Sequence, residues 1–493
     1  MTAQIPIIGR KREKKLLQDV LDSNEAEFVA IYGRRRVGKT FLIRQFFFDQ
    51  VFLEVTGEKD QAALVQIARF CDAVSKAFLD NVRLPQQRTW NDAFELLANA
   101  IEARSEKDPN TPIVVFLDEL PWMSTHRSGL IQALDYIWNA RLSRLRNIRL
   151  IVCGSAATWM LDKLVHAKGG LYNRVTQRIW LQPFTLAETD AYLKTRNVRL
   201  NNRQTSLLYM CMGGIPFYLK NVKKGWSVDQ AIGKLCFDEN GLLAEEFEHL
   251  FESLFSTSDT HKQVVRALAA KTSGLTKQDL VEHSKLKSGG GLKKTLQELE
   301  ASGFVASYGP LCKKKRDTLY RLVDEFSWFH LRWIEKAPSP AVRGDGATYW
   351  HTQASSPPFT AWSGYAFENL CLKHIDVLLH ALGLEGIGFA AGSWRFVGKP
   401  EGSSKKASGA QVDLVFDRND DTITLCEMKY TDEPFVITRK YARELDEKME
   451  VFEEVTKTKK SVQLAMVCSA GLKKNDYSDE MVSGQVSLED FFW

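Results

Sequence analysis

Short apolar runs alternate with amphipathic, helix-like segments along the first 190 residues or so of the chain. The runs "EFVAIYG" (27–33), "PIVVFLDEL" (112–120) and "IRLIVCGSA" (148–156) are rich in β-branched and other apolar residues. Continuous apolar runs of this length are typical of parallel strands that are buried on both faces. Helical patterns such as "DAFELLANAIEARS" lie between them. The alternation predicts a doubly wound α/β domain over residues 1–190.

The remaining pattern divides into four further segments. Residues 191–257 read as helices, and 258–334 read as three helices followed by two strands, which is the order of a winged helix. Residues 335–360 are rich in Pro, Gly, Ser and Ala, which predicts a linker. Residues 361–493 return to mixed helix and strand patterns. The chain is therefore predicted to be a multidomain α/β protein.

Composition narrows the class of protein only a little. The 493 residues carry a net charge of +5, which permits nucleic-acid binding without requiring it. The eight cysteines are scattered and form no CxxC pair, so we expect reduced core residues rather than disulfides or a zinc site. The N-terminus has no signal-peptide core, and no apolar run is long enough for a bilayer. These features predict a cytoplasmic protein.

The stretch "GRRRVGKT" follows the first predicted strand and opens a predicted helix. It fits the phosphate-binding pattern GxxxxGK[ST], in which a glycine-rich turn aims backbone N–H groups at phosphate oxygens. In this pattern the lysine balances phosphate charge and the threonine ligates Mg2+. The predicted ATP-binding residues of the loop are Gly33, Arg34, Arg35, Arg36, Val37, Gly38, Lys39 and Thr40.

A second acidic element completes the expected site. "VVFLDE" places Asp118 at the end of a buried strand, where it would hold Mg2+ through water. Glu119 beside it is positioned to polarise the attacking water. We therefore predict ATP binding and hydrolysis.

The roles of five further residues stay open at this stage. Each of Arg34, Arg35 and Arg36 could face phosphate or a neighbouring acid, or could be solvated or salt-bridged. Ser155, at the end of "LIVCGS", is a candidate sensor of the γ-phosphate. Arg174, in "LYNRVTQRIW", is either an arginine finger or an ordinary surface charge.

Six short motifs in a fixed order resemble a known family. They are "IIGRKREKKLL", "GRRRVGKT", "FLDELPWM", "CGSAATWM", "GGLYNR" followed by "PF", and "GGIPFYL". They resemble the archaeal-type ATPases of the STAND group, which are relatives of the AAA proteins. The resemblance implies that Ile8, Gly9 and Arg10 lie near the adenine, and that Gly214 and Pro216 form the lid contact with the nucleotide. It also implies a regulated switch.

The predicted winged helix carries lysines where a DNA backbone could be neutralised. Lys293 and Lys294 lie on its third helix, and Lys313, Lys314, Lys315 and Arg316 lie at its wing. The alternative is that this domain only packs between its neighbours.

The C-terminal segment carries acids and a lysine in the order of a metal-dependent phosphodiesterase. Asp413 lies on one predicted strand, while Glu427 and Lys429 share one face of the next strand. Glu368, in the preceding helix, is a fourth candidate. Asp413 and Glu427 would hold Mg2+ or Mn2+, and the lysine would stabilise charge. The alternative is a surface strand with alternating charges.

This order of helix, strand and ExK strand resembles the PD-(D/E)xK nuclease fold, which related ATPases carry as a C-terminal domain of the type called domain of unknown function 234. Gln411 stands where related proteins often have an acid. Arg439, Lys440 and Lys448, on the helix that follows, could track DNA or could form a solvated face with nearby acids.

Two hypotheses of function follow. The first is an ATP-binding and ATP-hydrolysing switch that acts on DNA through a metal-dependent nuclease domain. The second is a signalling or scaffold ATPase whose C-terminal domain binds nucleic acid or a partner without cleavage. The expected partners are DNA, a second copy of the chain if Arg174 serves a neighbouring site, and a protein activator.

Overall fold

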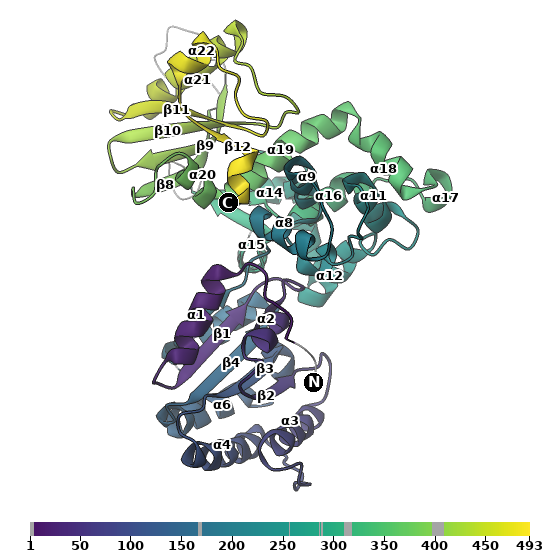
Figure 1. Ribbon diagram of the computed structural model, residues 1–493, viewed down its shortest axis with the longest axis vertical. Coiled ribbons are helices and arrows are strands. Elements are labelled where there is room, and N and C mark those ends of the chain that lie inside the picture. The colour runs from purple at the N-terminus through teal and green to yellow at the C-terminus, as the bar shows by residue number, and fades with distance from the viewer. Residues whose placement is uncertain are drawn as a thin grey trace.

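The computed structural model describes residues 4–165, 170–255, 257–284, 286, 289–309, 318–396 and 409–493. Two five-stranded sheets lie towards opposite ends of the molecule, and helices from the middle of the chain lie between them (Figure 1). The α/β class predicted from the sequence is confirmed for both ends.

The N-terminal unit is built on a parallel sheet in the order β2-β3-β4-β1-β5. Its elements are β1 (Glu27–Tyr32), β2 (Val51–Thr56), β3 (Ile113–Asp118), β4 (Ile148–Gly154), β5 (Gln177–Trp180), α1 (Lys11–Asp22), α2 (Lys39–Phe46), α3 (Ala63–Phe78), α4 (Trp90–Lys107), α5 (Leu120–Met123), α6 (Leu130–Ala140) and α7 (Ala157–Met160).

Alternate residues of β1 belong to two different cores. Phe28 and Ala30 are buried in the cluster that includes α3, α4 and α6, whereas Val29 and Ile31 are buried with α1 and α2. Because side chains alternate across a strand, the apolar run 27–32 can serve both faces only in a sheet covered on both sides. The carboxyl ends of these parallel strands therefore meet at one edge, where the loops carry the site.

The middle of the chain contains a group of helices and then a small domain in which β6 pairs antiparallel with β7. These elements are α8 (Leu186–Thr195), α9 (Asn202–Met212), α10 (Pro216–Leu219), α11 (Val228–Ile232), α12 (Glu246–Leu254), α13 (Ser258–Ala269), α14 (Lys277–Ser284), α15 (Gly290–Ala301), β6 (Val305–Tyr308) and β7 (Leu319–Leu322).

The segment predicted to be a linker, 335–360, is mostly helical, so that prediction is wrong. It contains α17 (Pro340–Arg343), α18 (Gly346–Ala354) and the start of α19 (Pro357–Lys373), and it follows α16 (Glu325–Phe329). Trp350 of α18 is fully buried and stacks on Phe237 with ring centroids 5.4 Å apart. Its partners are distant in sequence, so local composition gave no sign of this packing.

The C-terminal unit is a mixed sheet in the order β12-β11-β10-β9-β8. The pairs β8–β9 and β9–β10 are antiparallel, and β10–β11 and β11–β12 are parallel. Its elements after α19 are α20 (Ile375–Ala381), β8 (Phe389–Phe396), β9 (Ala410–Arg418), β10 (Thr422–Lys429), α21 (Arg439–Thr456), β11 (Ser461–Cys468), α22 (Asp476–Met481) and β12 (Val482–Ser487).

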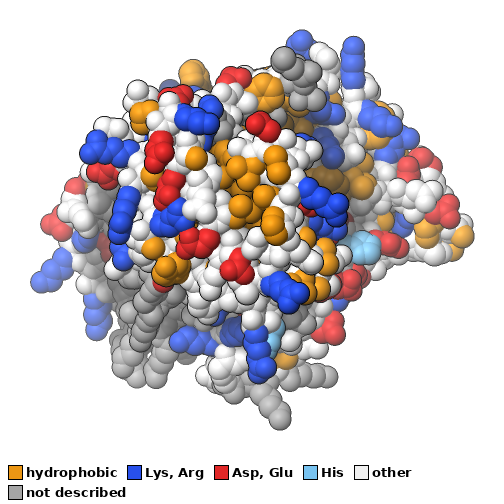
Figure 2. All heavy atoms as spheres, turned by 90° about the horizontal axis from the view of Figure 1, so that it is seen from below, with side chains coloured by type: hydrophobic (Ala, Val, Ile, Leu, Met, Phe, Trp, Pro, Cys, Tyr) orange, Lys and Arg blue, Asp and Glu red, His pale blue; other side chains and the backbone are white. Residues whose placement is uncertain are grey.

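One face of the molecule shows charges of both signs side by side. Seen from below, Lys and Arg side chains are interspersed with Asp and Glu around a group of hydrophobic side chains (Figure 2). None of the helices in the described ranges has the length and apolar character needed to cross a bilayer.

Candidate functional site

The loop between β1 and α2 has the backbone shape of a phosphate cradle. Gly33 and Gly38 have positive φ angles of 149° and 95°, which glycine adopts without strain. A Cβ at Gly33 would lie 2.3 Å from the carbonyl oxygen of Leu181, so no larger residue fits there. No side chain caps the N-terminus of α2. Its free N–H groups and its positive dipole end suit an anion.

Lys39 is buried at the first position of α2. Its Nζ donates to the carbonyl oxygens of Gly33 and Arg34, both at 3.0 Å. The ammonium group is thus held inside the loop, at the place where the sequence predicts phosphate contact.

The acidic residues predicted for magnesium and water lie beside this loop. Thr40 Oγ1 donates to Asp118 Oδ2 at 2.7 Å, which brings together the two groups expected at a magnesium ion. Glu119 follows directly, in a left-handed conformation with φ 49°. The amide and hydroxyl of Ser155 donate to Glu119 Oε2 at 3.0 and 2.9 Å. Ser155 and Glu119 therefore form one polar unit at the carboxyl edge of the sheet.

A cavity of about 1050 Å³ opens over the loop. Its wall includes residues 35–40, Ile8, Arg10, Glu119 and Pro216. The aromatic residues Phe184, Tyr192 and Phe217 also line it, and the sequence analysis did not single them out. Phe217 directly follows the "GGIP" motif, so its position next to Pro216 was the available signal.

Three residues near the cavity have supporting positions. Arg10 donates to the carbonyl oxygens of Gln182 (2.6 Å) and Val37 (3.1 Å), and burial lowers its pKa. Gly9 packs against the side chain of Glu188, and neither it nor Gly214 is among the residues that line the cavity. Gly214 accepts a hydrogen bond from the amide of Phe184 at 2.7 Å, in a space where a Cβ would lie 2.0 Å from a carbonyl oxygen.

The three consecutive arginines have different surroundings. Arg34 is buried and forms an ion pair with Asp324, which follows β7. Arg36 forms an ion pair with Glu246 of α12 and lies over the Phe217 ring, 4.2 Å from its centroid. Arg35 lines the cavity, 5.9 Å from the Trp122 ring centroid. Two of the three side chains therefore connect the loop to other domains.

Arg174 does not lie among the residues that line the cavity. It is exposed and precedes β5, whose first residue pairs with Val29 of the parallel strand β1. Arg174 is therefore at the edge of the sheet opposite the phosphate loop. From this position it does not contact a nucleotide in the cavity of its own chain.

In the C-terminal unit, the register of β9 and β10 places Asp413 and Glu427 next to each other, one step beyond the pair Leu414–Cys426. The amide of Met428 donates to Asp413 Oδ2 at 3.1 Å. Lys429 Nζ lies 3.9 Å from Glu427 Oε2. Burial and the neighbouring Glu427 raise the pKa of Asp413, and burial together with Asp413 raises the pKa of Glu368.

Two basic groups already contact these acids. Lys448 Nζ donates to Glu427 Oε1 at 2.6 Å, so among the described residues it pairs with an acid of β10 and not with the acids of its own helix. Arg321 of β7 lies 3.4 Å from Glu368, a contact that the sequence analysis missed. Within the described ranges, no three His, Cys, Asp or Glu side chains are grouped as ligands for a metal ion.

The third helix of the small middle domain, α15, contacts α7 of the N-terminal unit. Lys293 and Lys294 are exposed, and Lys294 Nζ lies 3.8 Å from Glu298. The predicted wing residues Lys313, Lys314, Lys315 and Arg316 lie outside the described residues. The packing of α15 favours an interdomain role for at least part of this domain.

The phosphate loop, the Thr40–Asp118 contact and the adjacent Glu119 together define a P-loop ATPase. Residues 8–222 match the family described as an ATPase domain predominantly from Archaea. Through these residues the chain belongs to that archaeal ATPase family, and its N-terminal unit is an ATP-binding ATPase domain.

Two proteins of Methanocaldococcus jannaschii are similar to this chain. An uncharacterized protein of Methanocaldococcus jannaschii is 24% identical over 86% of this chain and 88% of its own length. An uncharacterized ATP-binding protein of the same organism is 43% identical over 8% of this chain and 71% of its own length.

Two solved structures are also similar. The Walker-type ATPase of Pyrococcus abyssi is 18% identical, with a TM-score of 0.48 over 66% of this chain and 96% of its own. The ORC2 protein of Aeropyrum pernix is 15% identical, with a TM-score of 0.41 over 71% and 97%.

Proposed function

We propose that the protein is an ATP-operated switch that acts on DNA, and that its C-terminal domain cleaves phosphodiester bonds with a divalent metal. The observation that carries the DNA-cleaving part is the pairing of Asp413 and Glu427 on adjacent strands, with Lys429 on the same face as Glu427. The proposal is also supported by the order of α19 with Glu368, β9 with Asp413 and β10 with Glu427 and Lys429, although β8 stands between α19 and β9 as a strand that the sequence analysis did not predict.

The groups of the N-terminal unit fit ATP with magnesium. The loop amides and Lys39 would hold the phosphates, and Thr40 with Asp118 would hold the ion. When bound, magnesium would neutralise part of the negative charge on the phosphates. Glu119 would orient the attacking water once its carboxylate turns from Ser155, so the Glu119–Ser155 contact would act as a gate for hydrolysis.

The C-terminal acids fit a divalent cation in part. Asp413 and Glu368 both have raised pKa values, first because they are buried and then because another carboxylate lies nearby. A cation relieves such repulsion. Glu427 would join only after Lys448 releases it. A metal bound here would activate water and stabilise the leaving oxygen.

One observation favours the alternative, a signalling or scaffold ATPase. Lys448 and Arg321 neutralise Glu427 and Glu368 from within the chain. A permanently neutralised site would bind a partner or nucleic acid without cutting it.

The experiment that separates these functions is DNA cleavage by the full chain. Linear and supercoiled DNA is incubated with Mg2+ or Mn2+, with and without ATP. Asp413→Ala removes a proposed metal ligand, and Lys39→Ala removes the phosphate contact. Asp417→Ala is the matched control, because Asp417 lies on the same strand and pairs with Lys460. We expect cleavage by the wild type and Asp417→Ala only. Equal cleavage by Asp413→Ala, or none by any protein that hydrolyses ATP, would contradict the nuclease.

A further inference from the structure

The short strand β7 and the turn after it contact both candidate sites. Arg321 of β7 reaches Glu368 in α19, and Asp324, two residues beyond the strand, receives Arg34 from the phosphate loop. Only two residues separate these two contacts along the chain. A movement of this segment would therefore change the Arg34–Asp324 contact at the phosphate loop and the Arg321–Glu368 contact at the acidic site.

At the phosphate loop, the backbone and side chain of Arg34 are tied to different groups. Its carbonyl oxygen accepts a hydrogen bond from Lys39 Nζ, and its guanidinium pairs with Asp324 and lies 5.0 Å from the Phe304 ring centroid. Lys39 is the residue expected to bind ATP phosphates. When its ammonium group turns to a phosphate, the carbonyl of Arg34 loses its donor, and the loop is free to shift the guanidinium that holds Asp324.

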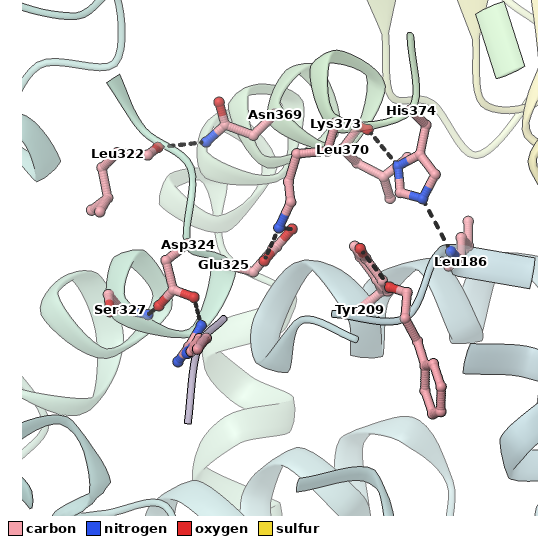
Figure 3. Close-up of polar contacts among 12 residues, drawn as sticks. Leu186, Tyr209, Leu322, Asp324, Glu325, Ser327, Asn369, Leu370, Lys373 and His374 are labelled. Carbon is pink, nitrogen blue, oxygen red and sulfur yellow. Dashed lines mark hydrogen bonds and ion pairs between the residues drawn. The ribbon is translucent and has the colours of Figure 1, made fainter. Parts of the chain in front are cut away.

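The turn after β7 is fastened to α19 as well (Figure 3). Lys373 Nζ donates to both carboxylate oxygens of Glu325, at 2.7 and 2.8 Å. Asn369 Nδ2 donates to the carbonyl oxygen of Leu322 at 3.1 Å. Asp324 itself accepts from the amide of Ser327 at 2.8 Å and so caps α16. These contacts join the turn and α19 into one packed unit.

The contact of Arg321 with the acidic site is weaker than the contact at Asp324. Its distance to Glu368 is 3.4 Å, and its buried Nε has no hydrogen-bond partner among the described residues. α19 packs against β10, and Glu368 is close enough to Asp413 of β9 and Lys429 of β10 for their charges to act on its pKa. A guanidinium in this place neutralises a carboxylate that a cation would otherwise share.

We propose that Arg34, Asp324 and Arg321 form a relay in which ATP binding at the phosphate loop releases β7 and withdraws Arg321 from Glu368. The relay rests on the proposed function, because it regulates the same acidic site. A buried charge that loses its partner is costly, so intermediate positions of the segment are unfavourable. The segment therefore switches between two discrete positions and does not move gradually. The contact of Arg321 is the one that opens, since among the described residues it is held by one ion pair of 3.4 Å.

Hydrogen exchange on the full chain tests the first half of the relay. A slowly hydrolysed ATP analogue is added at saturation, and the amides of β7 and of the turn to α16 are followed. We expect faster exchange in the wild type and no change in Lys39→Ala. Unchanged exchange of β7 in wild type with bound analogue would overturn the relay.

Nucleotide affinity tests the second half, because coupling between two sites is reciprocal. Arg321→Met removes the Arg321–Glu368 contact before ATP binds. ATP then no longer has to break this contact, so Arg321→Met should bind ATP about 5- to 150-fold more tightly than the wild type. Arg321 does not line the ATP cavity, so the effect cannot come from direct contact with the nucleotide. Glu368→Gln breaks the same contact from the other side and should act in the same direction. Arg395→Met is the matched control. Arg395 also crosses between domains, to Ser273 at 3.2 Å, but lies off β7. Wild-type ATP affinity in both Arg321→Met and Glu368→Gln would overturn the relay.

A separate measurement distinguishes failure of the relay from failure of the proposed cleavage. Mn2+ binding is measured without nucleotide in the wild type, Arg321→Met and Arg321→Met/Asp413→Ala. Tighter binding in Arg321→Met that the second substitution removes supports both proposals. Arg321→Met that binds Mn2+ no better than the wild type overturns the role given to Arg321 at the acidic site. If no protein binds Mn2+ there while exchange and ATP affinity respond as expected, the coupling of β7 to ATP is supported and the metal-dependent cleavage is overturned.

Discussion

The ion pair between Arg34 and Asp324 gives the sharpest test of how the ATPase domain is joined to the rest of the chain. Both side chains are almost fully buried, with exposures of 4% and 1%. Asp324→Asn keeps an oxygen that can cap α16 but removes the charge. It leaves the Arg34 guanidinium buried without a counterion. Breaking a buried pair from one side costs about 3–5 kcal/mol, so we expect a loss of that size in the free energy of unfolding.

The double variant separates this electrostatic cost from a loss of packing. Replacing both partners of a buried ion pair with uncharged groups of similar volume is often neutral. Arg34→Met/Asp324→Asn should therefore be more stable than the sum of the single changes predicts, by at least about 2 kcal/mol. Urea unfolding at neutral pH, followed by circular dichroism, measures all four proteins.

The control is a pair between α2, the helix that follows the same loop, and the strand β2. Arg44 and Glu54 form an ion pair in which Arg44 is half exposed. Exposed pairs contribute about 0–1 kcal/mol, so Arg44→Met should change stability little. If Asp324→Asn costs less than about 1 kcal/mol, or if the two single effects at Arg34 and Asp324 simply add, the pair does not hold the domains together.

Three further outcomes are expected from the structure. Glu119→Gln should still bind ATP, while its turnover falls about 10²- to 10⁴-fold, measured by phosphate release. Gly33→Ala should lose ATP binding in equilibrium dialysis, because its Cβ would lie 2.3 Å from the carbonyl of Leu181. Burial lowers the pKa of His330 to about 4, while Glu248 raises this pKa and Arg266 lowers it, both by less than burial does. The unfolded chain therefore takes up this proton first as pH falls below about 6.5, and up to about 3 kcal/mol of stability is lost between pH 6.5 and 4. His330→Phe, which can still stack on Phe247, should flatten that loss in urea unfolding.

The sequence predicted those parts of the fold whose signals are local. The strand ending at Tyr32, the turn with its two glycines and the helix that starts at Lys39 lie within twenty residues, and each has its own pattern. Asp118 could be located because a fully buried strand has no other place for a charged residue than its end.

The parts that could not be predicted depend on partners far along the chain. Arg34 and Arg36 meet acids about 290 and 210 residues away, and nothing in "GRRRVGKT" indicates which arginine pairs with which acid. Trp350 was assigned to a linker because its neighbours are small and polar, yet its ring packs on Phe237. Lys448 was placed on a charged helix face, whereas its flexible side chain reaches Glu427 on another element.

These long-range contacts give a physical reason for three arginines in a phosphate loop. The loop lies where the ATPase domain, α12 and the turn after β7 meet, and both neighbours present a buried carboxylate to it. Arg36 forms an ion pair with Glu246 in α12, and Arg34 forms one with Asp324 after β7. Arg35, which makes no ion pair with any described residue, is the one whose charge remains available to the cavity. A loop that cradles phosphate thus also carries the contacts that fix the domains, and any rearrangement of it on binding ATP must change the energy of those contacts.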